Sequence, residues 1–71
     1  MMRVYSMSGE LVSDCATTFD GLRNIAVRMQ QAGESGMSCH GSVEDHYTGE
    51  IAHLSGECHV DQIIDRFTVQ H

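Results

Sequence analysis

The chain contains no lysine and few cations of any kind. Its four basic residues are all arginine, against ten acidic residues and five histidines, which gives a formal charge of −6 with histidine neutral. Walker-A phosphate loops and Schiff-base enzymes both need a lysine ammonium group, so the sequence excludes both classes. Domains that bind DNA or RNA usually carry a basic stripe, so the acidic balance predicts no nucleic-acid binding.

Long apolar runs and signal sequences are also missing. No segment approaches the roughly 18 apolar residues that a membrane span needs, so we expect no membrane insertion. Arg3 and the pair Gly9-Glu10 stand where a signal peptide would have its apolar stretch, which predicts a cytoplasmic protein. Three cysteines, an odd number, favour reduced thiols over a disulfide framework.

Motifs of hydrolytic enzymes are absent as well. The chain has Asp, Ser and His residues, but no Gly-x-Ser-x-Gly segment that would form a nucleophile elbow. We therefore expect a protein that is not an enzyme.

Seventy-one residues suffice for one small domain, expected to span residues 1–71. Similar turns at Ser8-Gly9 and Thr48-Gly49 suggest a ββα pseudo-repeat of residues 1–33 and 37–71. A core of this size has little stability to spare, which favours a homodimer.

The first half predicts a hairpin followed by a helix. A two-residue turn at Ser8-Gly9 would place Arg3 opposite Asp14 and Tyr5 opposite Val12. The other face of this hairpin would carry Met2, Val4 and Leu11. Thr17 or Thr18 caps the helix that follows, and Gly33 ends it. One apolar stripe at spacings of three and four consists of Phe19, Leu22, Ile25, Ala26 and Met29.

A second hairpin is predicted over residues 37–47 and 50–57, around Thr48-Gly49. A two-residue loop places Cys39 opposite Cys58, Val43 opposite Leu54, Glu44 opposite His53 and His40 opposite Glu57. One face is then apolar or small, with Cys39, Gly41, Val43, Ala52, Leu54 and Gly56. The opposite face is polar, with His40, Ser42, Glu44, His46, His53, Ser55 and Glu57, and Ile51 is its only apolar member.

An amphipathic helix is predicted from His59 to about Val69. It places Val60, Ile63, Ile64 and Phe67 on one side. These elements together predict an α+β fold of order ββαββα, a small antiparallel sheet with two helices packed on one face.

Histidines and carboxylates on the second hairpin are candidate metal ligands. His40, His46, His53 and Glu44 could bind zinc or nickel if three of them converge on one ion. The alternative is a solvated face on which Glu44–His53 and Glu57–His40 form cross-strand ion pairs. The spacing lacks the compact C-x₂-C and H-E-x-x-H motifs that identify zinc sites.

Cys39 and Cys58 are a candidate thiol pair. Directly opposite each other, they would lie within disulfide reach. The alternative is that both fill the core as small buried thiols.

The leading hypothesis is that the protein is a small acidic, non-enzymatic module for protein–protein interaction or regulation. It would act as a homodimer or with another protein. Its predicted interaction surface consists of His40, Glu44, His46, Ile51, His53 and Glu57. One alternative is a histidine-based transition-metal-binding protein. The other is an acidic inhibitor of a nucleic-acid-handling enzyme, which would occupy a basic groove.

Overall fold

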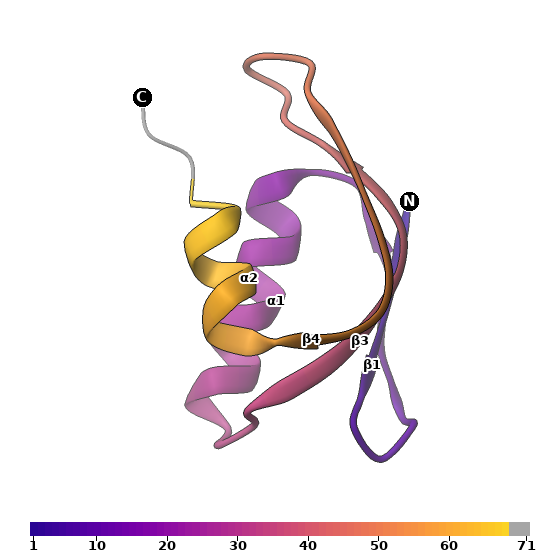
Figure 1. The fold of residues 1–71 in the computed structure, drawn as a ribbon, viewed down its shortest axis with the longest axis vertical. Helices are drawn as coiled ribbons and strands as arrows, with labels where there is room; N and C mark the ends of the chain where they lie inside the picture. The colour runs from indigo at the N-terminus through magenta and orange to yellow at the C-terminus, as the bar shows by residue number, and fades with distance from the viewer. Residues whose placement is uncertain (69–71) are drawn as a thin grey trace.

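Two helices pack on one face of a four-stranded antiparallel sheet, as Figure 1 shows. The computed structural model describes residues 1–68. Its elements are β1 (Met2–Ser6), β2 (Leu11–Ala16), α1 (Phe19–Gln31), β3 (Gly36–Glu44), β4 (Ile51–His59) and α2 (Val60–Arg66). The strands lie in the order β2-β1-β3-β4, and every neighbouring pair is antiparallel. The predicted α+β fold of order ββαββα is confirmed.

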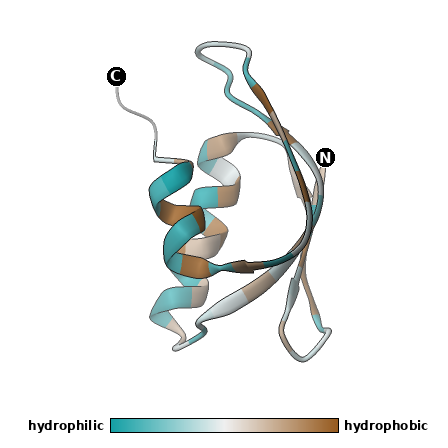
Figure 2. Cartoon of the chain, viewed as in Figure 1, coloured by the Kyte–Doolittle hydropathy of each residue, from teal (hydrophilic) through white to brown (hydrophobic). Residues whose placement is uncertain are grey.

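The hydrophobic core lies between the concave side of the curved sheet and the two helices (Figure 1). Along the elements that enclose it, hydrophobic residues alternate with hydrophilic ones (Figure 2). The buried apolar residues are Met2, Val4, Ala16, Phe19, Leu22, Ile25, Ala26, Met29, Met37, Cys39, Val43, Ala52, Val60, Ile63 and Phe67. They include all five residues of the apolar stripe predicted for the first helix, which confirms its period.

Helix α1 begins and ends where local signals predict. Thr18 is the N-cap, and its hydroxyl oxygen accepts a hydrogen bond of 3.0 Å from the backbone N–H of Gly21. Gly33 has φ +87°, and its N–H donates to the Gln30 carbonyl while that of Glu34 donates to the Met29 carbonyl. These two bonds form a Schellman motif, which satisfies carbonyls that the helix end would otherwise leave unpaired.

Helix α2 is shorter than the sequence predicts. His59 is its N-cap rather than its first residue, and the helix ends at Arg66. Val60 and Ile63 are buried, Ile64 packs against the core, and Phe67 is buried just after the helix. The predicted end near Val69 lies outside the described residues.

The register of the β1–β2 hairpin differs from the prediction. Ser6 and Glu10 close the turn with a 2.8 Å hydrogen bond from the Ser6 N–H to the Glu10 carbonyl, so three residues form the loop. Tyr5 therefore pairs with Leu11, not Val12, and a one-residue shift turns a side chain to the other face. Leu11, predicted on the apolar side with Met2 and Val4, is 51% exposed instead.

The same hairpin contains two irregularities that were not predicted. Register shifts lie on either side of Val4, which pairs with Ser13, while Met2 pairs with Ala16. Such bulges change the offset between the strands along the ladder. Val4 keeps the pairing with Ser13 that the predicted turn implies, whereas Arg3 lies at the shift between Met2 and Val4, so its facing of Asp14 stays a prediction.

The β3–β4 hairpin is shifted by two residues from its predicted register. Strand β3 ends at Glu44 and β4 begins at Ile51, so six residues form the loop instead of two. Cys39 faces Gly56, Val43 faces Ala52 and Glu44 faces Ile51. A shift by an even number keeps each side chain on its predicted face, so the division into an apolar and a polar side holds.

The two halves of the chain occupy comparable places in the sheet. Each contributes an inner strand (β1 or β3), an outer strand (β2 or β4) and a helix. This order is compatible with the pseudo-repeat of residues 1–33 and 37–71, which stays a prediction. Within residues 1–68, neither helix has the length and apolar character needed to cross a membrane.

Candidate interaction face

Among residues 1–68, one side of the sheet carries no helix over strands β1, β3 and β4. Successive side chains of a strand point to opposite faces, so the partners of the buried residues project away from the core. We call this surface the helix-free face. It consists of Arg3, Tyr5, Ser38, His40, Ser42, Glu44, Ile51, His53, Ser55, Glu57 and His59. Five of the six residues predicted to bind a partner lie on it: His40, Glu44, Ile51, His53 and Glu57.

His40 lies near the middle of the helix-free face and is held by two neighbours. Its Nε2 atom is 3.0 Å from the hydroxyl of Ser38 on the same strand. Its ring meets that of Tyr5 on β1 edge to face, with centroids 6.1 Å apart and planes at 69°. The sequence alone gave no signal for Tyr5 or Arg3 in this surface, because nothing local predicts that β1 pairs with β3.

The cross-strand pairs of the helix-free face are not the predicted ones. His40 faces Ser55 and His53 faces Ser42, because the long loop shifts the ladder by two residues. Glu44 and His53, like His40 and Glu57, therefore lie diagonally across the strands instead of directly opposite each other. The prediction that these pairs face each other is wrong, although all four residues keep their predicted face.

His46 lies in the β3–β4 loop and not on a strand. The carboxylate of Asp45, which is 7% exposed, accepts a 2.9 Å hydrogen bond from the backbone N–H of Tyr47. The Asp45 N–H donates to the Glu50 carbonyl and the Gly49 N–H donates to the Asp45 carbonyl, at 2.8 and 2.7 Å. This Asx turn ends the strand at Glu44, which is why the prediction of a strand through Tyr47 is wrong. The His46 ring instead contacts that of Tyr47, with centroids 4.1 Å apart.

The predicted zinc or nickel ligands do not form a cluster. His40 and Glu44 are four residues apart on β3, His53 is on β4, and His46 is in the loop. Among residues 1–68, no three His, Cys, Asp or Glu side chains lie where they could hold one metal ion. Three converging ligands are the minimum for the sites considered, so the geometry offers nothing in favour of a metal at these residues.

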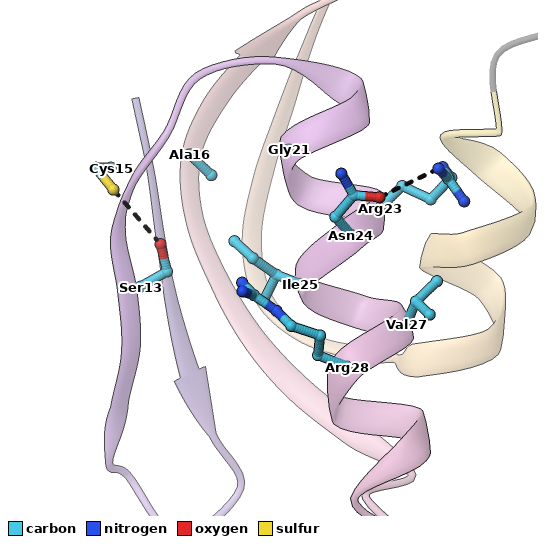
Figure 3. Close-up of a pocket in the computed structure, with 9 residues that line it drawn as sticks. All are labelled: Ser13, Cys15, Ala16, Gly21, Arg23, Asn24, Ile25, Val27 and Arg28. Carbon is cyan, nitrogen blue, oxygen red and sulfur yellow. Dashed lines mark hydrogen bonds between the residues drawn. The ribbon is translucent and has the colours of Figure 1, made fainter.

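A second surface feature, which the sequence analysis missed, is a groove of about 550 Å³ between β2 and α1 (Figure 3). It is lined by Ser13, Cys15, Ala16, Gly21, Arg23, Asn24, Ile25, Val27 and Arg28. Cys15 and Ser13 project from β2, and the sulfur of Cys15 is 3.9 Å from the Ser13 hydroxyl oxygen. The groove lies on the helix side of the sheet and is therefore separate from the helix-free face.

The two other thiols lie on the helix side of β3 and β4. Cys39 is fully buried in the core, and Cys58 is partly buried and packs against it. The expectation that they face each other is wrong, since Cys39 faces Gly56 and Cys58 faces Met37. Burial raises the pKa of the Cys39 thiol to about 12, and the neighbouring Cys58 adds to this increase.

Comparisons of the chain with models of protein families, with curated proteins and with solved structures found no match. The function is therefore inferred from the chain's own surfaces.

Proposed function

We propose that this chain is a non-enzymatic module for protein–protein interaction, acting in the cytoplasm, and that the helix-free face binds its partner. A second copy of the chain is the first candidate for that partner. The observation that carries the proposal is a sheet whose helices both pack on one side, so that no other element of residues 1–68 covers the opposite side of β1, β3 and β4.

The chemistry of the helix-free face supports this role. It includes Tyr5, Arg3 and Ile51, and the Ile51 side chain is 57% exposed on its strand. Interfaces are enriched in tyrosine and arginine and depleted in other charged residues at their centres. An isoleucine on a strand surface gains about 1.5–3 kcal/mol when a partner buries it fully.

Electrostatics also support self-association through this face. Of the ten acidic residues, the helix-free face carries only Glu44 and Glu57, together with Arg3. Its formal charge is −1 with histidine neutral, against −6 for the whole chain. Two copies that meet through this face therefore bring together the less charged part of an acidic molecule, which limits like-charge repulsion.

Sedimentation equilibrium over a range of concentrations tests the homodimer. We expect wild type to dimerise and Ile51→Asp to shift towards monomer, because the variant replaces the exposed apolar side chain with a carboxylate directly opposite Glu44. Val12→Asp is the matched control, since Val12 is also an exposed β-branched residue but lines a depression on the helix side, beside Ile25 and Met29. An equal effect of both substitutions would contradict the proposed face.

A partner other than a second copy needs a different experiment. If wild type is monomeric, the same three proteins serve as bait in lysate from the source cells. We expect a bound protein that Val12→Asp retains and Ile51→Asp loses. A monomeric wild type whose bound proteins are the same for all three baits would contradict the proposed function.

The acidic-inhibitor alternative stays a prediction from composition. A charge-driven contact with a basic groove would weaken steeply with added salt, whereas contact through the helix-free face should depend on salt only mildly. Washing the bound material at low and high salt separates the two.

A further inference from the structure

Cys39 and Cys58 lie on adjacent strands and point to the same side of the sheet. In the β3–β4 ladder Cys39 faces Gly56 and Cys58 faces Met37, so the two cysteines are diagonal neighbours. Diagonal neighbours on one face lie about 7–8 Å apart, just beyond the Cα separation that a disulfide bridges without backbone movement. The residue directly opposite Cys39 is Gly56, where an added Cβ would meet nothing within 4 Å.

The Cys58 side chain leans along its strand towards this open position. Its sulfur is 3.7 Å from the carbonyl oxygen of Gly56, to which the thiol donates. Cys58 is also near enough to Cys39 to contribute to the raised pKa of the Cys39 thiol. The structure therefore holds two free thiols on the same side of adjacent strands, at a spacing from which a small shift of the strands would bring them to disulfide distance.

The two thiols differ in how a reagent in solution can reach them. Cys39 is fully buried, and its pKa is raised to about 12, so it stays protonated. Cys58 is partly exposed at the end of β4, and it lines a surface depression with Met7, Ser35, Gly36, Glu57 and His59. Access decides which cysteine a reagent in solution meets first, and it favours the partly exposed Cys58 over the buried Cys39.

We propose that Cys58 is an oxidation site for hydroperoxides and that Cys39 is its resolving partner. In the first step the Cys58 sulfur attacks hydrogen peroxide, the O–O bond breaks, and Cys58 becomes a sulfenic acid while one water leaves. In the second step the Cys39 sulfur attacks the Cys58 sulfur, the S–O bond breaks, and a second water carries away the Cys39 proton. The sum is two thiols and one peroxide giving one disulfide and two waters.

The disulfide would act on the part of the fold that carries the helix-free face. It joins β3 to Cys58, the penultimate residue of β4, which directly precedes the N-cap of α2. Cross-linking the base of this hairpin restricts the unfolded chain and so raises the melting temperature. The inference does not depend on the proposed interaction function, because it concerns residues on the opposite side of the sheet.

Cys15 lies apart from the other two cysteines. It lies on β2, which β1 separates from β3, and its nearest polar contact is Ser13 in the groove of Figure 3. It is exposed and therefore open to oxidants. It has no neighbouring thiol among residues 1–68, so we expect it to form only mixed or intermolecular disulfides.

The test uses the full chain with Cys15→Ser, reduced and then treated with hydrogen peroxide. We expect a product without disulfides between chains that has lost two hydrogens, has no free thiol after denaturation, and returns to the starting mass with dithiothreitol. Digestion after glutamate separates the two cysteines, because Glu44, Glu50 and Glu57 lie between them. The expected fragment contains Cys39 and Cys58 joined by a disulfide, and it separates into two peptides on reduction.

Two further measurements leave the buried Cys39 unchanged and so do not depend on whether a core variant folds. A dimedone trap added with the peroxide should label Cys58 and not Cys39 in the Cys15→Ser chain. Cys15→Ser/Cys58→Ser, which changes only the partly exposed thiol of the pair, should leave Cys39 unreacted. Sulfinic acid on Cys58 with Cys39 still free, or disulfides between chains only, would overturn the inference and leave the dimer experiments unaffected.

Discussion

Phe19 at the start of α1 and Phe67 just after α2 meet edge to face, with ring centroids 4.9 Å apart and planes at 78°. Both rings are buried, at 7% and 1% exposure. The contact closes one end of the helix pair and fixes the position of the short second helix. Edge-to-face geometry places the positive edge of one ring against the negative face of the other, which adds to the gain from burial.

The aromatic pair predicts a measurable coupling between the two helices. Phe67→Ala should destabilise the protein by about 3–5 kcal/mol, since it leaves a large cavity in a small core. The milder changes Phe19→Leu and Phe67→Leu, made singly and together, should show a coupling of about 0.5–1.5 kcal/mol in urea unfolding. Strictly additive effects would mean that the rings contribute by burial alone.

Replacing either of two glycines in the β3–β4 hairpin with alanine should lower the stability of the protein by different amounts. Gly41 and Gly56 both have positive φ, +132° and +122°, where an alanine is strained. A Cβ on Gly56 would meet nothing within 4 Å, whereas one on Gly41 would overlap the carbonyl oxygen of Met1. Gly56→Ala should therefore cost about 1–3 kcal/mol and Gly41→Ala clearly more. Equal losses in urea unfolding would show that the contact with Met1 is unimportant.

The N-cap of α1 can be distinguished from its neighbour by mutation. Thr18→Ala removes the acceptor of the Gly21 N–H and should cost about 0.5–2 kcal/mol. Thr17→Ala is the control, because Thr17 contributes its backbone carbonyl, which accepts from the Glu44 N–H, and its side chain is exposed. We expect that change to stay within about 0.5 kcal/mol. A larger loss for Thr17→Ala in thermal unfolding would refute this assignment.

The buried Cys39 thiol predicts a loss of stability at alkaline pH. Burial raises its pKa from 9.0 to about 12, so unfolding at intermediate pH releases a proton. The stabilisation is complete below the pKa of the unfolded thiol and is lost as the pH rises from about 9 towards 12. Urea unfolding under reducing conditions, at about pH 8 and about pH 10.5, should show a larger drop for wild type than for Cys39→Ala. Cys15→Ser, at an exposed thiol, should behave like wild type.

Helix α1 was predictable because its signals are local. The N-cap hydroxyl, the apolar stripe and Gly33 act within one or two turns of each other, and each acts as expected. The loops were harder, because their lengths depend on competing hydrogen bonds. Asp45 could have continued β3, but its buried carboxylate caps the Tyr47 N–H instead and sets a six-residue loop.

The candidate site was predictable only in part, for the same reason. The alternation along β3 and β4 correctly assigned His40, Glu44, Ile51, His53 and Glu57 to one face, because a two-residue shift preserves it. His46 was misplaced because its position depends on where the strand ends. Tyr5 was missed because its contact with His40 requires that β1 pair with β3 across more than thirty residues of chain.

The order of amino acids by itself determined which residues are apolar, where α1 starts and stops, and which side chains of the second hairpin share a surface. These properties follow from the helical and strand periods, which operate between near neighbours. Only the tertiary structure decided that β1 and β3 form the centre of the sheet and that Cys58 lies diagonally across from Cys39. Such pairings are set by the packing of distant segments around one core and by loop geometry, and neither has a local sequence signature.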